Sequence, residues 1–224
     1  MQTRPYDLLI FDWDGTLSDS AIHIVDCMQR ATRALGLAEC SAANIRNMIG
    51  LSLQEVIQRL YPGITSGQQR ELIQEYREEY LLRNWRVTPL FAGARQTLEQ
   101  LRDAGYHLAI ATGKSRRGLE CELAEHDLQD LFVLSRCADE TLSKPDPLML
   151  QEILTDYNTS ADCALMIGDT EYDLQMAANI GMAALAVSYG AHDRERLLAL
   201  QPIACLDAIT ELPAYLNDLK HCPQ

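Results

Sequence analysis

Two aspartates, Asp12 and Asp14, stand two positions apart directly after an uninterrupted apolar stretch. In an extended chain, residues i and i+2 point the same way, so both carboxylates can reach one small volume while Gly15 lets the chain turn. Two negative charges that close together raise the pKa of one carboxyl or attract a cation. Aspartate and glycine are also ordinary turn residues, so a purely structural turn is the alternative interpretation.

Three later segments carry polar groups that could complete such a site. The first opens an expected helix, where a hydroxyl and free backbone N–H groups can hold a phosphate. The second places one lysine ahead of two prolines that fix a loop and begin a helix, and the third adds two carboxylates. Taken singly, each is common as a turn, a surface charge or a helix cap. The residues are Thr112, Gly113, Lys144, Asp169 and Asp173.

The elements that must position these groups are apolar stretches. Residues 8–11 show no polar alternation, which is typical of a central strand in a parallel sheet covered by helices on both faces. Similar stretches at 107–111 and 164–167 precede two of the later segments. Function in such sheets lies at the carboxyl ends of the strands. We therefore predict the α/β class, with a Rossmann-like parallel sheet core flanked by helices.

The segment between the first two groups of polar residues differs in character. Residues 19–88 contain no apolar strand but several amphipathic helical patterns. These patterns cover 21–35, 53–60 and 67–84. We expect an α/β core of residues 1–18 and 89–224, with an inserted all-helical cap domain of residues 19–88.

Length and composition fit a protein with a substantial buried core. The chain has 224 residues, of which 47% are hydrophobic. It lacks the run of about 18 apolar residues that a membrane span needs, and residues 1–7 are too polar for a signal peptide. The cysteines form no Cys-x-x-Cys pair, so we expect reduced thiols in a cytoplasmic protein. They are Cys27, Cys40, Cys121, Cys137, Cys163, Cys205 and Cys222.

The charge balance restricts the partners. A formal net charge of −13 argues against nucleic acid, because phosphate backbones are bound by basic patches. A small phosphate ester held by a metal and by local cations is compatible with this charge. Either a monomer or a dimer is compatible with the sequence.

The polar groups and their order resemble the four motifs of the haloacid dehalogenase-like (HAD) phosphohydrolase superfamily, and most of all its phosphoglycolate phosphatase-like branch. The resemblance spans nearly the whole chain. Asp12-Trp13-Asp14-Gly15-Thr16 is similar to the first motif, Thr112 to the second and Lys144 to the third. Gly168-Asp169 together with Asp173 is similar to the fourth.

The resemblance implies a mechanism. Asp12 would attack phosphorus and form an aspartyl-phosphate, which water then hydrolyses. Asp14 would protonate the leaving oxygen and later take a proton from that water. An inserted cap would close over the site, exclude water and admit only small leaving groups.

The same resemblance implies a Mg²⁺ cofactor and a phosphate-binding set. The ligands of Mg²⁺ would be Asp12, the backbone carbonyl of Asp14 and Asp169, with Asp173 supporting them through water or a lysine. Hard oxygen ligands of this kind are those that Mg²⁺ prefers. The phosphoryl oxygens would be bound by Thr112, the Gly113 N–H and Lys144.

The loop of residues 46–52 resembles the substrate-specificity turn of this family. Arg46 could pair there with a substrate carboxylate, and Gly50 would allow close approach. The alternative is that Arg46 is a solvated helix residue and Gly50 a helix stop. Many chains of the phosphoglycolate phosphatase-like branch have Pro in place of Ser52 and Asn in place of Gly113, so the substrate stays open.

Two other functions remain open: a phosphotransferase or mutase of sugar phosphates, and a non-catalytic binding module. All three lysines, Lys114, Lys144 and Lys220, lie outside residues 19–88. The cap lysine of phosphonate-cleaving relatives and the cap His–Lys pair of hexose phosphate mutases are therefore missing. The second acid of the first motif, which haloacid dehalogenases lack, favours phosphate chemistry.

Overall fold

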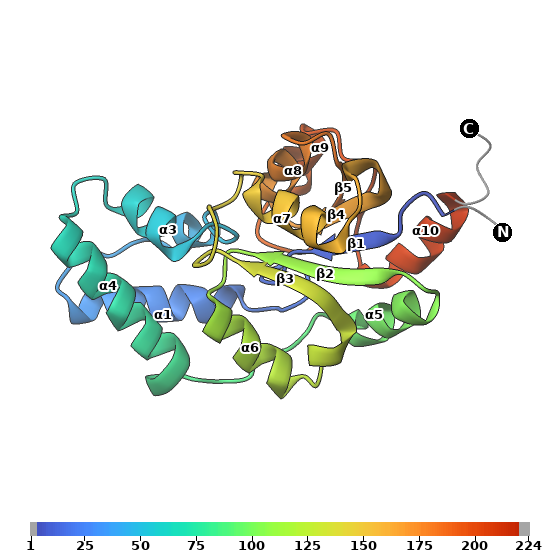
Figure 1. Ribbon diagram of the computed structural model, residues 1–224. Coiled ribbons are helices and arrows are strands. Elements are labelled where there is room, and N and C mark those ends of the chain that lie inside the picture. The colour runs from blue at the N-terminus through green and yellow to red at the C-terminus, as the bar shows by residue number, and fades with distance from the viewer. Residues whose placement is uncertain (1–3, 220–224) are drawn as a thin grey trace.

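The strand that precedes the first two aspartates lies in the middle of the sheet. A computed structural model describes residues 4–219 (Figure 1). In it, β1 (Leu8–Phe11) is fully buried and pairs in parallel with β2 (His107–Thr112) on one side and with β4 (Ala164–Gly168) on the other. The three apolar stretches are therefore the neighbouring strands that the sequence predicts.

The sheet has six strands in the order β3-β2-β1-β4-β5-β6, and every pair is parallel. The chain builds outward from β1 first on one side and then on the other, so a topological switch point lies between β1 and β4. Ligands in such sheets bind beyond the carboxyl ends of the strands at this point. Three strands are not predicted by the sequence: β3 (Phe132–Cys137), β5 (Ala183–Val187) and β6 (Cys205–Leu206).

Helices cover both faces of the sheet (Figure 1). Along β1, Leu9 and Phe11 join a cluster formed with α5, α6 and α10, whereas Leu8 and Ile10 join a cluster formed with α7 and α8. Because successive residues point to opposite faces and both faces are covered, β1 carries no polar residue. The helices of this part are α5 (Ala94–Asp103), α6 (Arg116–Glu125), α7 (Leu148–Tyr157), α8 (Glu171–Ala178), α9 (Arg194–Leu198) and α10 (Leu212–Leu219), and the 3₁₀ turns are η2 (Gln129–Leu131), η3 (Ala161–Cys163) and η4 (Ile209–Glu211).

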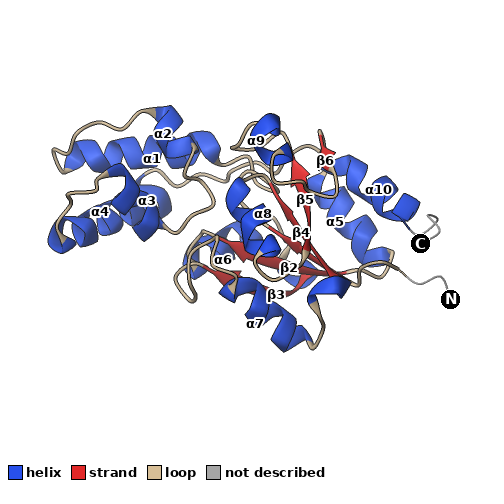
Figure 2. Ribbon diagram, turned by 90° about the horizontal axis from the view of Figure 1, so that it is seen from above, coloured by secondary structure: helices blue, strands red, loops and turns tan. Residues whose placement is uncertain are grey.

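A group of helices between β1 and α5 lies to one side of the sheet (Figure 2). They pack around their own apolar cluster, which includes Met28, Ile57 and Leu72, and Tyr172 of α8 reaches into it. The elements are α1 (Ala21–Ala34), α2 (Ala42–Arg46), α3 (Leu53–Leu60), α4 (Ser66–Glu78) and the π-helix η1 (Glu79–Arg83). The short α2 is not predicted by the sequence, and the pattern at 67–84 is an α-helix followed by a π-helix.

Two further expectations concern the chain as a whole. Within residues 4–219, every helix is too short or too polar to cross a membrane. The six cysteines in that range are free thiols, as expected, and three of them are buried. Cys222 and Lys220 lie outside the described residues.

Candidate active site

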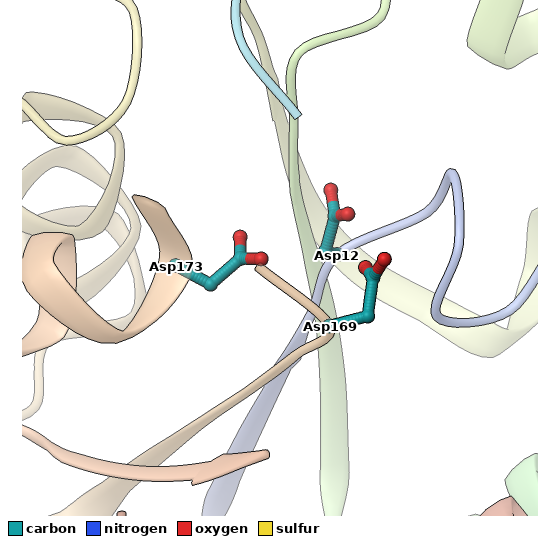
Figure 3. Close-up of side chains that lie close together, drawn as sticks. All are labelled: Asp12, Asp169 and Asp173. Atoms are coloured by element: carbon teal, nitrogen blue, oxygen red, sulfur yellow. The ribbon is translucent and has the colours of Figure 1, made fainter. Parts of the chain in front are cut away.

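Three buried carboxylates meet at the switch point. Asp12 directly follows β1, Asp169 directly follows the neighbouring β4, and Asp173 lies in the first turn of α8. One oxygen atom from each lies within 4.8 Å of the others, and all three side chains are fully buried (Figure 3). The register of the two strands thus places groups that are far apart in sequence at one point of the sheet edge.

Lys144 lies inside this carboxylate cluster. Its Nζ donates to Asp12 Oδ1 and to Asp173 Oδ1, at 2.6 Å in both cases, and the side chain is fully buried. Burial alone would lower the pKa of an ammonium group, but the two carboxylates hold the pKa of Lys144 above its ordinary value. A single ammonium group therefore faces three carboxyl groups, which leaves an excess of negative charge when all are ionised.

Two carboxyl groups of the cluster have raised pKa values, as the excess negative charge and their burial require. Burial raises the pKa of Asp169 to about 7, and the neighbouring Asp173 adds to the rise. Burial likewise raises the pKa of Asp12 well above its ordinary value, against the opposing effect of Lys144. Asp169 is nevertheless held in place, because Thr16 Oγ1 donates to it at 2.8 Å and the Ala191 N–H at 2.7 Å.

One atom of the cluster has no hydrogen-bond partner among the described residues. It is Asp12 Oδ2, which is completely buried. A carboxylate oxygen without a donor, in a cluster of carboxylates with excess negative charge, fits a divalent cation that prefers oxygen ligands. Gly15 lets the loop after β1 approach Asp169, which follows β4. Its φ is +92°, and a Cβ at this position would lie 2.2 Å from Asp169 Oδ2.

Asp14 belongs to a second group of side chains. Ser20 Oγ donates to its Oδ1 at 2.6 Å, and Lys114 Nζ lies 3.0 Å from the same oxygen. Burial raises the pKa of Asp14, and Lys114 opposes the rise. The two aspartates of the first motif thus have different lysine partners, Lys144 for Asp12 and Lys114 for Asp14.

Lys114 and Glu122 are site residues that the sequence analysis missed. Glu122 Oε1 accepts hydrogen bonds from Lys114 Nζ at 2.9 Å and from Tyr80 Oη at 2.6 Å. Its Oε2 accepts from Trp13 Nε1 at 2.6 Å and from Ser18 Oγ at 3.3 Å. Burial would raise the pKa of this carboxyl, but Lys114 and the other donors lower it to about 2.

A signal for Glu122 was present in the sequence. It follows Leu119 by three positions and precedes Leu123, and both leucines belong to the core cluster. Residues three positions apart on a helix share a face. An acid on the apolar face of a helix needs a buried partner, and that requirement points to a cation nearby.

Thr112 and Gly113 lie at the carboxyl end of β2. Thr112 is fully buried, and its Oγ1 accepts from the Lys114 N–H at 3.1 Å. A Cβ at position 113 would lie 2.5 Å from the carbonyl oxygen of Gly50 and 2.6 Å from that of Leu51. Glycine is therefore required at this position of the chain.

Arg46 was predicted as a site residue, but in the structure it does not lie beside the other predicted site residues. It is the last residue of α2 and is exposed. It also lies outside the set of residues that line the cavity beside Asp14. Ser52 caps α3 by accepting from the Glu55 N–H, and its own N–H donates to Ser143 Oγ, next to Lys144, at 2.8 Å.

The chain matches the family of haloacid dehalogenase-like hydrolases over residues 9–187 and belongs to that family. Among its relatives is a phosphoglycolate phosphatase of Vibrio vulnificus, 27% identical over 95% of this chain and 96% of the relative. A 5'-nucleotidase of Pseudomonas aeruginosa is 30% identical over 88% of this chain and 89% of the relative. A crystallised haloacid dehalogenase-like hydrolase of Streptococcus pneumoniae has a TM-score of 0.81 at 25% identity, over 94% and 98% of the two chains. The chain is thus an enzyme of this family, a phosphatase, and not an idle binding module.

Proposed function

We propose that the protein is a Mg²⁺-dependent phosphatase that hydrolyses a small phosphomonoester through an aspartyl-phosphate intermediate. The observation that supports this most strongly is the state of Asp12. Its Oδ1 is bound by Lys144, whereas its buried Oδ2 accepts no hydrogen bond from the described residues. An oxygen with unused lone pairs serves as a nucleophile or as a metal ligand.

Asp12 is the nucleophile in this proposal. Its carboxylate attacks phosphorus, the bond from phosphorus to the leaving oxygen breaks, and an aspartyl-phosphate forms. Lys144 orients the carboxylate through the 2.6 Å contact to Oδ1. Water then attacks the intermediate and restores the free aspartate.

Asp14 is the acid and base. Burial raises the pKa of this carboxyl, which favours the protonated form that gives a proton to the leaving oxygen, and the resulting carboxylate then accepts a proton from water. Ser20 and Lys114 hold this side chain in place.

The metal ligands in this proposal are Asp12, the backbone carbonyl of Asp14 and Asp169, with Asp173 acting through its contact to Lys144. Bound Mg²⁺ would offset the excess negative charge of these carboxylates and of the phosphate.

The phosphoryl oxygens are bound by Thr112, the Gly113 N–H and Lys144. Thr112 Oγ1 already accepts from the Lys114 N–H, so its own hydrogen is available to donate to a phosphate. Donors fixed in this way stabilise the negative charge that spreads over the oxygens during transfer.

The division of the chain is part of the same proposal. Residues 1–18 and 89–224 form the catalytic core, and residues 19–88 form a cap domain that closes over the site. The separate apolar cluster of α1–α4 supports this division. We place the enzyme in the cytoplasm and propose a small phosphomonoester as its substrate, the class that includes phosphoglycolate, which is named for the relative of Vibrio vulnificus.

Phosphate release with matched variants tests this function. The purified enzyme should release phosphate from phosphoglycolate and 4-nitrophenyl phosphate, lose the activity in excess chelator and regain it with Mg²⁺. With a substrate labelled in its phosphoryl group, acid quenching should trap label on the wild type and on the control Asp130→Asn. Asp12→Asn should trap none and lower kcat by at least about 10³-fold. Label on Asp12→Asn, or full activity in chelator, would refute the mechanism.

A further inference from the structure

A cavity of about 200 Å³ adjoins Asp14 on the side of the helical group. Asp14, Gly113 and Lys114 line it from the sheet side, and α1, α3 and α4 line it from the other. A general acid must lie within hydrogen-bond distance of the oxygen that it protonates. The group attached to that oxygen therefore occupies this cavity. The cavity exceeds the apolar void of about 150 Å³ that accepts a benzene molecule.

The walls of the cavity are mostly apolar. Several of the lining side chains are only half-buried, so their carbon atoms face the empty space. A ligand with apolar surface would remove this area from water, which is favourable. The lining apolar residues include Ile24, Met48, Leu53, Ile73 and Leu81.

Lys114 is the cation of the cavity that lies beside Asp14, and its donors are in use. An ammonium group has three N–H donors. The Nζ atom of Lys114 lies 3.0 Å from Asp14 Oδ1, 2.9 Å from Glu122 Oε1 and 2.8 Å from Tyr80 Oη. It thus has no N–H left for a substrate carboxylate.

The remaining charges do not favour a second anion near Asp14. Asp139 is itself acidic, and its Oδ1 accepts from the Arg116 N–H. Arg77 is exposed and also lines a wider opening of about 520 Å³, which shares Ile73 and Ser115 with the inner cavity. The walls of this outer opening contain three arginines, with Arg70 and Arg117 added to Arg77, against the two acids Glu78 and Asp139, so its net positive charge can attract a phosphate dianion.

We propose that the leaving alcohol of the substrate is uncharged and largely apolar, with the size of a branched alkyl or aryl group. Its oxygen lies against Asp14 and its carbon skeleton fills the cavity. The reaction balances as a hydrolysis: the phosphorus–oxygen bond to the alcohol breaks, Asp14 gives that oxygen its proton, and water supplies the replacement oxygen and proton. This proposal rests on the proposed function, and it predicts that a carboxylated leaving group such as glycolate is a poor fit, because the ammonium group beside Asp14 has no N–H left for the carboxylate and the acidic side chains of the lining repel it.

A pair of esters of matched shape tests the charge preference. Isobutyl phosphate and phosphoglycolate differ in that an isopropyl group replaces the carboxylate, so two methyl groups stand where the two carboxylate oxygens were. We expect kcat/KM to be at least about tenfold higher for isobutyl phosphate and to rise further for benzyl phosphate, since one methylene in an apolar pocket changes selectivity by about 10–200-fold. A preference for phosphoglycolate would overturn the apolar assignment and leave the phosphatase function intact. Failure of every ester to release phosphate would instead overturn the proposed function.

A cavity-filling variant tests the location. Ile73→Phe enlarges a side chain that lines the cavity, whereas Ile64→Phe enlarges a half-buried side chain of the same apolar cluster that does not line it. The ratio of kcat/KM for benzyl phosphate to that for methyl phosphate should fall about tenfold in Ile73→Phe and stay unchanged in Ile64→Phe. Because both rates come from the same preparation, partial unfolding leaves the ratio unaffected. An unchanged ratio in Ile73→Phe, or an equal fall in the control, would place the leaving group elsewhere.

Discussion

The site contains two buried lysines, each between two carboxylates, and the two differ in what surrounds them. Lys144 links Asp12 and Asp173, both on the sheet part of the chain, and Asp169 adds a third carboxyl group. Lys114 links Asp14 and Glu122 and also contacts Tyr80 of the helical group. The first cluster thus belongs to one part of the molecule, and the second joins both parts.

The clusters also differ in how well their polar atoms are satisfied. Each carboxylate oxygen of Glu122 accepts two hydrogen bonds, and the pKa of this carboxyl is lowered. Asp12 retains an oxygen without a partner among the described residues, and the pKa values of Asp12 and Asp169 are raised. Satisfied buried networks hold a structure in place, whereas unsatisfied charge attracts a ligand. We infer that the Lys144 cluster is built for binding and the Lys114 cluster for positioning.

The largest expected contrast between the clusters concerns Mg²⁺. Saturating Mg²⁺ at about 100 times its Kd should stabilise the wild type by about 2.7 kcal/mol. Asp169→Asn should lose this stabilisation together with activity, yet without metal it should be at least as stable as the wild type, because it removes uncompensated negative charge. Glu122→Gln is the control and should keep the metal-dependent rise in Tm. An equal rise in Asp169→Asn, measured by thermal unfolding with and without Mg²⁺, would contradict the distinction.

Glu122→Gln should instead lower the free energy of unfolding by about 3 kcal/mol at pH 7, because it breaks a buried ion pair. The folded-state pKa of Glu122 is about 2, below the ordinary value of 4.5. Its contribution is therefore fully present above pH 4.5 and is lost as the pH falls toward 2. Denaturant unfolding at several pH values should show the difference from the wild type shrinking below pH 4.5. A difference that grows there would give the wrong sign.

Tyr80→Phe should have a smaller effect. It removes the hydroxyl that contacts both Lys114 and Glu122, at an expected cost of about 1 kcal/mol in stability. Because this hydroxyl joins the helical group to the sheet part, kcat/KM should fall several-fold as well. Tyr157→Phe is a suitable control, since Tyr157 is the last residue of α7, lies outside both clusters and the cavity, and its hydroxyl makes no hydrogen bond within the described part of the chain. Equal losses of kcat/KM in the two variants would argue against a role of the shared hydroxyl.

Arg46→Ala is expected to change least. The side chain is exposed and lies outside both clusters and the cavity, so kcat/KM should change by less than about twofold, as for a typical surface substitution. The measurement is KM for phosphoglycolate and for isobutyl phosphate. A rise in KM for phosphoglycolate alone would support the carboxylate contact that the specificity loop suggested.

The contrast between the clusters also explains what could be predicted from the sequence. Asp12 and Asp169 follow apolar strands, and the carboxyl ends of parallel strands meet at one edge of the sheet. The sequence therefore sufficed to predict that these two side chains lie close together. Lys114 follows Thr112 and Gly113 in a short turn, so the sequence alone gives it no partner. Its partners Glu122 and Tyr80 lie on a helix face and in a π-helix, and no local sequence pattern predicts how these pack. Their roles in turnover remain predictions.

The strands show the same limit. Continuous apolar runs directly before the polar motif residues identified β1, β2 and β4. The stretch Ala183–Val187 is rich in alanine, which favours helices in isolation, and only pairing with β4 makes it a strand. The edge strand Phe132–Cys137 is largely half-buried and therefore lacks a continuous apolar run.

The central place of β1 has a consequence for how the protein is made. Leu8 pairs with His107 and with Ala164, so β1 is synthesised before both of its neighbours and cannot pair until they follow. Synthesis proceeds at roughly 5–20 residues per second, which leaves the apolar strand unpaired for several seconds. The helices of residues 20–88 pack mainly on one another and can form during this interval. The nascent chain thus exposes the unpaired apolar strand β1 next to helices that have already folded. A chaperone that binds extended apolar segments would cover β1 until β4 emerges.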